Sequence, residues 1–207
     1  MKGLIIKDFL VLKQNGKVYL FMLAGYTIYS FLMKDLSMIS VMIALWSFMA
    51  NLSAFSYDEK AKWDLFILST SITRKQLVLS KYIFALLLCG VGAVVTLPLN
   101  IANVLVNSID MLNMIYLLLA VCGISYFLSA LLYPLIFKFG VEKARSFMIV
   151  IFMIPMLAPL LMNSLGIHIA IDSAQLNFLP LVASVALVIV SLISYQISCH
   201  IMLNKDM

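Results

Sequence analysis

Six long stretches of this chain are almost entirely apolar, and the charged residues gather between them. A hydrophobic run of about 18 residues or more indicates a transmembrane helix, because about 20 residues rising about 1.5 Å each cross the roughly 30 Å hydrocarbon layer. The fragments between the runs are too short for a soluble domain. The pattern therefore predicts an all-α, polytopic membrane protein with a single transmembrane domain over residues 1–207. The six predicted spans are residues 18–33, 36–56, 78–106, 111–137, 146–165 and 178–203.

The stretch before the first span, residues 1–17, places Ile5, Phe9 and Leu12 at helical spacing, and its lysines and glutamine fall mostly elsewhere on the helical wheel. A basic amphipathic helix of this kind lies along a membrane surface. We therefore expect an interfacial helix over residues 1–17, at the inner face of the membrane. A basic tail that only sets the topology is the alternative.

Residues 56–82, SYDEKAKWDLFILSTSITRKQLVLSKY, form the only long stretch that mixes charged with apolar residues. Ser56 and Glu59 have the S-x-x-E spacing of a capping box, which predicts that a helix starts where the second span reaches the inner surface. We expect this helix to cover residues 57–68. It lies between the second and third predicted spans.

Turn-favouring residues follow this predicted helix. The sequence STSIT, residues 69–73, is rich in side chains that favour turns and helix caps, so the helix should end there. Thr73 and Gln76 then form a second capping box, which predicts the start of the helix that leads into the third span.

The predicted helix over residues 57–68 is amphipathic, with Trp63, Phe66 and Ile67 on one face. A helix that rests on the anionic inner leaflet would favour a basic polar face. Residues 58–64 instead hold three acidic residues and two lysines, and an exposed tryptophan is a residue that anchors protein interfaces. We therefore favour a helix that docks in a protein groove over one that rests on lipid.

The composition agrees with a membrane protein, since 64% of the residues are hydrophobic and 11% are charged, against about half and about a quarter in soluble domains. The net charge is +5, and of the 14 Lys and Arg residues only Lys34 falls on the outer side of a six-span arrangement. Basic residues near span ends stay in the cytoplasm, so both termini are predicted inside. The basic balance indicates topology and attraction to anionic lipid, and we expect no nucleic-acid partner.

No predicted span has a charged residue near its centre, which weakens an ion-coupled carrier as the function, because buried charges usually mark ion or proton routes. Three asparagines do occur within the spans, and Asn100 and Asn103 share one helical face. Asparagines often join membrane helices by hydrogen bonds. The alternative, which stays open, is that Asn51, Asn100 and Asn103 line a substrate path.

The sequence shows no catalytic or metal-binding pattern. His168 and Asp172 are spaced i, i+4 but lack a third ligand, so loop polarity is the better interpretation. Cys89, Cys122 and Cys199 lie far apart within predicted spans, without disulfide or metal-ligand spacing. H-E-x-x-H, a nucleophile elbow and G-x-x-x-x-G-K-[ST] are all missing, so we expect a non-enzymatic chain without a nucleotide site.

The predicted topology resembles that of the type 2 ABC-transporter permeases, which have six spans, an N-terminal interfacial helix and a charged helix between spans two and three. The mixed segment is similar to the pattern E-x-x-x-W-x-x-x-x-x-S-x-x-x-x-R-x-x-x-x-x-x-K-Y of the small bacterial members. This group includes exporters of phenol-soluble modulins and of lantibiotics. The matching residues are Glu59, Trp63, Ser69, Arg74, Lys81 and Tyr82.

The resemblance implies a mechanism in which two permease chains, identical or related, pair above two ABC ATPase subunits. ATP and Mg²⁺ would bind to the ATPase subunits, and this chain would carry no cofactor. The helix over residues 57–68 would act as the coupling helix, with two apolar anchors and three charged residues that set the register. The residues assigned to this ATPase interface are Asp58, Glu59, Lys62, Trp63 and Phe66.

The function implied by the resemblance is export of amphipathic or antimicrobial-type peptides across a bacterial cell membrane. Apolar spans with many of the 14 methionines suit flexible amphipathic ligands. The alternative function is a non-transporting membrane scaffold or sensory anchor that recruits a cytoplasmic partner through the helix over residues 57–68.

Overall fold

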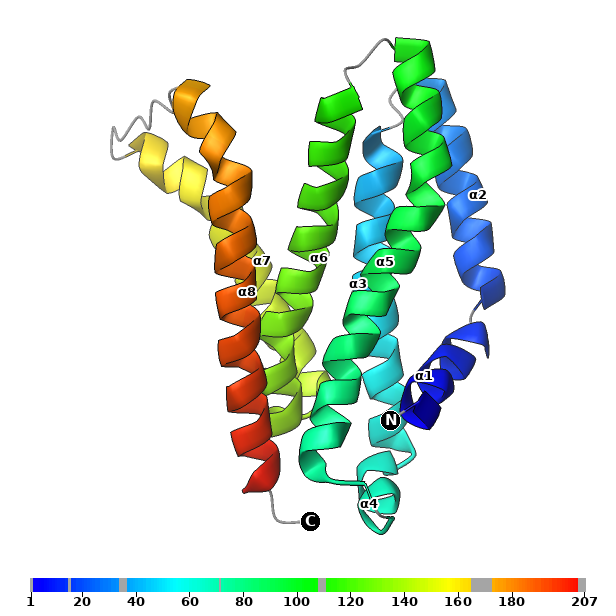
Figure 1. The fold of residues 1–207 in the computed structure, drawn as a ribbon, viewed down its shortest axis with the longest axis vertical. Helices are drawn as coiled ribbons and strands as arrows, with labels where there is room; N and C mark the ends of the chain where they lie inside the picture. Colours follow the sequence, from blue (N-terminus) through cyan, green and yellow to red (C-terminus); the bar gives the residue numbers. More distant parts are fainter. Residues whose placement is uncertain are drawn as a thin grey trace.

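The computed structural model of the chain consists of helices joined by short turns in the part that it describes, which is residues 2–14, 16–33, 37–70, 72–107, 111–164 and 173–204 (Figure 1). Within these ranges no strand occurs, as the sequence predicted. The helices are α1 (Lys2–Gln14), α2 (Gly16–Met33), α3 (Ser37–Lys60), α4 (Trp63–Leu68), α5 (Arg74–Asn107), α6 (Met111–Phe139), α7 (Val141–Ser164) and α8 (Ser173–Leu203).

Three of these helices contain segments that are long and apolar enough to cross a membrane, within the residues described. They belong to α5, α6 and α8. Helices α2, α3 and α7 occupy the positions of the other three predicted spans, whose membrane crossing stays a prediction. The three candidate spans are Arg74–Pro98, Leu118–Phe139 and Ser184–Leu203.

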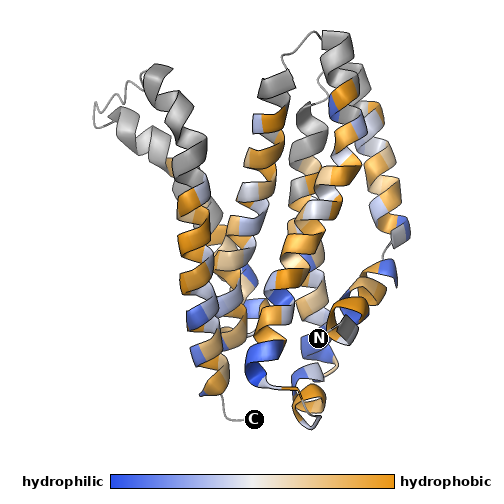
Figure 2. Ribbon diagram, viewed as in Figure 1, coloured by the Kyte–Doolittle hydropathy of each residue, from blue (hydrophilic) through white to orange (hydrophobic). Residues whose placement is uncertain are grey.

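Helices α3, α5 and α6 form the centre of the bundle, because each of them packs against the other two. Helix α8 covers α5 and α6, α7 packs on α6 and α3, and α2 packs on α3 and α1. In Figure 1 the short helix α4 and the last turn of α8 lie at the same end of the bundle, with α1 beside them at a steep tilt. We call this end the α4 end. In the ribbon of Figure 2, hydrophilic residues gather around α4 and the start of α5, and the long helices are coloured mostly as apolar.

The main apolar core lies between α3, α5, α6 and α8. Its centre is aromatic: the ring of Phe55 lies 5.1 Å from that of Tyr133 and 5.6 Å from that of Phe137, between centroids. Such edge and tilted contacts stabilise beyond simple burial. Many large apolar side chains elsewhere are exposed, including Phe21 on α2 and Val94 on α5, as expected for a surface that faces lipid.

The predicted helix start after Ser56 is wrong. Helix α3 continues through Lys60, so Ser56 and Glu59 lie inside its last turns, and residues 57–68 do not form one helix. The chain turns at Lys62, whose left-handed φ of 48° breaks the helical path, and α4 begins at Trp63. The local capping pattern failed because Glu59 binds a backbone group of α7 instead.

The end of α4 and the start of α5 follow the prediction. The Ser69 hydroxyl donates to the carbonyl of Phe66 at 2.7 Å as α4 ends. The Thr73 amide then donates to Oε1 of Gln76 at 3.1 Å, and the Gln76 amide donates to Oγ1 of Thr73 at 3.3 Å. This is a reciprocal capping box, and α5 begins at Arg74 as a result.

Helix α1 is present, but it ends at Gln14 and its predicted lipid-facing side contacts protein. Phe9 meets the ring of Phe84 on α5 edge to face at 5.3 Å, and Leu12 is buried in the same small core. The side that stays exposed carries Ile6 and Leu10. Apolar residues on both sides allow α1 to pack on the bundle and still present an apolar surface to a membrane.

Candidate functional site

Helix α4 presents an apolar tip at the end of the bundle. Phe66 is 60% exposed and Leu65 is 49% exposed. On the other side of the helix Ile67 is buried and Trp63 is half-buried against the main core. The rings of Trp63 and Phe66 lie 5.3 Å apart, so the inner aromatic residue supports the outer one. The tryptophan, expected to be exposed, is therefore an internal support.

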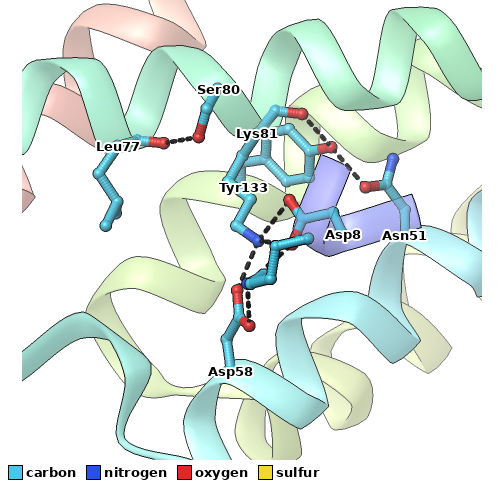
Figure 3. Close-up of polar contacts among 8 residues, drawn as sticks. Asp8, Asn51, Asp58, Leu77, Ser80, Lys81 and Tyr133 are labelled. Carbon is cyan, nitrogen blue, oxygen red and sulfur yellow. Dashed lines mark hydrogen bonds and ion pairs between the residues drawn. The ribbon is translucent and has the colours of Figure 1, made fainter. Parts of the chain in front are cut away.

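Asp58, which the sequence assigned to the ATPase interface, faces inward. Its carboxylate forms ion pairs with Lys7 of α1 and with Lys81 of α5, the latter at 2.5 Å. Lys81 also donates to both oxygens of Asp8 at 2.9 Å, and Lys7 lies 2.8 Å from the same carboxylate. Figure 3 shows the Lys81 side chain reaching toward Asp8 and Asp58. We call Lys7, Asp8, Asp58 and Lys81 the charge cluster.

The charge cluster is almost completely shielded from solvent. The exposed side-chain fraction is 1% for Asp8, 5% for Lys81, 8% for Asp58 and 21% for Lys7. Buried charges are tolerated when each one is paired and hydrogen-bonded. Here each lysine contacts both carboxylates, so two positive and two negative charges balance within one site.

Aromatic rings line the charge cluster and extend it to α4. The ammonium of Lys7 lies 4.7 Å from the centroid of the Trp63 ring, and that of Lys81 lies 5.0 Å from the centroid of Phe55. Cations are attracted to the face of such rings. Among the described contacts, the buried indole N–H of Trp63 has no hydrogen-bond partner. Through Trp63 the cluster therefore contacts α4 as well as α1, α3 and α5.

Glu59 is exposed, but its carboxylate also binds within the protein and joins α3 to α7. Its Oε2 accepts the amide of Val141 at 2.7 Å, at the first turn of α7, where free N–H groups and the helix dipole favour a carboxylate. Gly140 has a φ of 84°, which favours glycine, and a Cβ there would lie 2.7 Å from Oε1 of Glu59, so the glutamate side chain would have to shift. Arg145 adds a second link by donating to Oγ of Ser56 at 3.0 Å.

Arg74 joins the start of α5 to the end of α8. One of its guanidinium nitrogens, Nη1, donates to the carbonyls of Met202 at 2.9 Å and Leu203 at 2.8 Å. These carbonyls belong to the last turn of α8, where no intrahelical donor is available. The arginine therefore acts as a C-terminal cap supplied by another helix.

Tyr82 makes a second link between α5 and α8. Its hydroxyl lies 2.6 Å from Oγ of Ser194 and 3.0 Å from Oγ of Ser198, inside the main core. The Ser194 hydroxyl in turn donates to the carbonyl of Ala130 on α6. The ring of Tyr82 packs at a right angle on Tyr133, with centroids 4.7 Å apart.

Most residues of the sequence pattern thus join one helix to another, a role that their spacing did not indicate. Each of four of them binds a helix other than its own: Glu59 binds α7, Lys81 binds α1, and both Arg74 and Tyr82 bind α8. The sequence interpretation missed Asp8 as a partner. The available signal was an acidic residue within an otherwise basic amphipathic helix.

Of the three asparagines predicted as a possible substrate path, Asn51 is the one whose contacts the structure gives in detail. Asn51 is buried, accepts a hydrogen bond from the Tyr133 hydroxyl at 2.9 Å and donates to Oγ of Ser129 at 3.4 Å, so it joins α3 to α6. Asn100 is also buried, and the side chain of Asn103 lies outside the part described. For Asn51 the contacts favour helix joining.

Two cysteines that are distant in sequence are neighbours in the structure. The thiol of Cys89 on α5 lies 3.8 Å from the carbonyl oxygen of Cys122 on α6. The thiol of Cys122 lies 3.8 Å from the carbonyl oxygen of Cys89. Both line a crevice between α3, α5 and α6 and both are free thiols. Cys199 is buried elsewhere, while His168 and Asp172 lie outside the described residues.

These features define a membrane-embedded helical subunit whose α4 end is tied together by buried polar links. Residues 3–203 match the family described as ABC-2 family transporter protein, and the chain belongs to this family. It is therefore the membrane component of an ABC transporter, which works with an ATPase subunit, and the resemblance to type 2 permeases is confirmed. No curated protein and no solved structure matches the chain.

Proposed function

We propose that this chain is the permease of an ATP-driven exporter and that its ATPase binds the tip of α4. The observation that carries the proposal is the exposure of Leu65 and Phe66 on a helix whose other side is fixed to the main core by Ile67 and Trp63. Exposed aromatic and aliphatic side chains on a rigid support are typical anchors of protein interfaces.

The charged part of the proposed interface is smaller than the sequence suggested. Lys62 is exposed beside α4 and stays in the proposed contact. Asp58 is buried in the charge cluster, and the exposed Glu59 uses its carboxylate to accept the Val141 amide, so both are left out of the proposed contact. Leu65 takes their place next to Phe66.

The proposed orientation has the α4 end and both termini in the cytoplasm of a bacterial cell. Exposed basic residues at this end, including Lys75, Lys138 and Lys143, are the type that remains inside. ATP and Mg²⁺ bind to the ATPase subunits in this proposal. A second permease, identical or related, completes the transporter.

Amphipathic peptide is the proposed substrate class. The buried charges that the structure describes gather at the α4 end, and the middle parts of the three candidate spans carry none. A pathway between such helices offers apolar and hydroxyl or amide groups, which suit an amphipathic chain better than an ion. Membership in a transporter family leaves the scaffold alternative without an observation that favours it.

The test is co-purification of the chain with a P-loop ATPase encoded beside it. Phe66→Ala should raise the dissociation constant at least about fivefold, since truncation of an interface anchor costs more than about 1 kcal/mol. Leu203→Ala is the matched control, because Leu203 is an exposed apolar residue at the same end but outside α4. Wild-type affinity in a Leu65→Ala/Phe66→Ala double variant would overturn the proposed docking site.

A further inference from the structure

The charge cluster joins four elements that are separate in the sequence. Asp58 lies in the last turn of α3, just before the turn at Lys62 that leads into α4. Lys81 lies two turns into α5, after the chain leaves α4. Lys7 and Asp8 belong to α1, and Lys7 also covers the ring of Trp63. Both connections of α4 to the bundle are therefore bound to α1.

The cluster is saturated by its own members, so it is not a ligand site. Each of the two lysines contacts each of the two carboxylates, and the charges sum to zero. Moving α1 away from α3 and α5 would break the Lys7–Asp58 and Lys81–Asp8 pairs and leave each buried charge with one partner instead of two, which is unfavourable. The arrangement therefore resists relative movement of α1, α3 and α5 at this point.

Apolar contacts strengthen the same joint. Phe9 of α1 packs edge to face on Phe84 of α5, and Leu12 lies in the same small core. Ile6 and Leu10 remain exposed on the opposite side of α1. A movement that reaches α1 would thus also displace an apolar helix surface at the membrane.

We propose that α1 is a moving part of the coupling mechanism: α1, the last turn of α3, α4 and the first two turns of α5 move as one rigid body, held together by the charge cluster. This inference rests on the proposed function, in which the ATPase pushes on α4. In this mechanism α1 transmits the push to the bundle near the membrane surface. The positioning residues that hold the rigid body together are Lys7, Asp8, Asp58 and Lys81.

The first experiment measures distances in the complete complex of permease and ATPase. Spin labels on a cysteine-free chain are placed at exposed positions, Lys13 on α1, Lys75 on α5 and Leu119 on α6. Between nucleotide-free and ATP-trapped complexes, the Lys13–Lys75 distance should stay constant and the Lys13–Leu119 distance should change. A change in the first distance, or no change in either, would overturn the inference.

The second experiment removes one balanced ion pair. Asp58→Asn/Lys81→Met takes away one negative and one positive charge and leaves Lys7 paired with Asp8. In proteoliposomes with a dye-labelled amphipathic helical peptide, ATPase binding and ATP hydrolysis should persist, while the peptide transported per ATP should fall at least about tenfold. A wild-type ratio of transport to hydrolysis would show that the cluster does not couple.

The matched control is Glu142→Gln/Lys75→Met, which removes the same two charges at exposed positions and should keep the wild-type ratio. If the Asp58/Lys81 variant does not fold, the distance measurements in the otherwise native chain decide the question. Failure of the proposed function is seen separately, as a wild-type complex that binds no ATPase or moves no peptide. The inference itself fails if the wild-type complex binds the ATPase and moves peptide, but the measured distances or the ratio of transport to hydrolysis give the contradicting results stated above.

Discussion

The Glu59 carboxylate accepts the amide of Val141 at 2.7 Å, so the last turn of α3 caps the first turn of α7. Because of this contact, a Cβ on Gly140, between α6 and α7, would meet Oε1 of Glu59 at 2.7 Å. The contact also fixes the start of α4 to α7, a helix that is far from α4 in the sequence. The geometry of the α4 end therefore depends on this carboxylate as well as on apolar packing.

Gly140→Ala should destabilise the protein by about 1–3 kcal/mol, because its φ of 84° is unfavourable for alanine and the new Cβ would meet Oε1 of Glu59. The loss should be smaller in a Glu59→Ala background, where only the backbone strain remains. Denaturant unfolding in detergent measures both. Gly90→Ala is the control: a Cβ there meets open space within a helix, so its stability should stay equal or rise by up to about 1 kcal/mol.

Tyr82→Phe should lower stability by about 1 kcal/mol, because the hydroxyl that lies between Ser194 and Ser198 is lost while the ring contacts remain. Thermal unfolding in detergent provides the measurement. Tyr116→Phe, at an exposed position on α6, should leave the midpoint unchanged. Equal midpoints for the two variants would mean that the α5–α8 hydroxyl cluster contributes nothing.

Arg74→Met should loosen the end of α8, since the carbonyls of Met202 and Leu203 lose their donor. Loss of about 1 kcal/mol of local stability corresponds to about fivefold faster amide exchange in this turn. Hydrogen exchange with mass spectrometry of a C-terminal peptide reports the change. Lys75→Met is the control, because it removes a neighbouring exposed cation and should leave the exchange rate of this turn unchanged. Identical exchange rates in the Arg74→Met and Lys75→Met variants would contradict the capping role.

Asn51→Ala and Tyr133→Phe should each reduce stability by about 1–2 kcal/mol, because each removes the buried hydrogen bond between the Tyr133 hydroxyl and Asn51. Their effects should not be additive, since both break the same hydrogen bond. If Asn51 only joins helices, the selectivity of the transporter among amphipathic peptides should not change. A changed ranking of peptides in a competition assay, at unchanged stability, would instead place Asn51 on the substrate path.

The sequence alone predicted those features that depend on neighbouring residues. Hydrophobic runs located the long helices, because the preference of about 20 successive residues for the membrane interior depends on those residues alone. The Thr73–Gln76 capping box located the start of α5 for the same reason. The Ser56–Glu59 pair had equally good local spacing but failed, because the N-terminus of α7 competes for the same carboxylate. Local spacing could not reveal that competitor.

The resemblance to a permease family also came from the sequence, through residues whose individual roles the spacing did not explain. Trp63 and Phe66 were both predicted as anchors, yet one supports α4 from inside and the other is exposed. On a helix of six residues, a rotation of a few tens of degrees decides which side chain faces out. Packing against α3 and the main core sets that rotation.

Only the tertiary structure decided which charges face one another. Asp8 and Lys81 are 73 positions apart, and nothing in either stretch of sequence marks the other as its partner. Their pairing depends on how α1 lies against α5, which is set by Phe9 and Phe84 among other apolar contacts. Burial then makes the pairing obligatory, because a charge removed from water must find its counterion within a few ångströms.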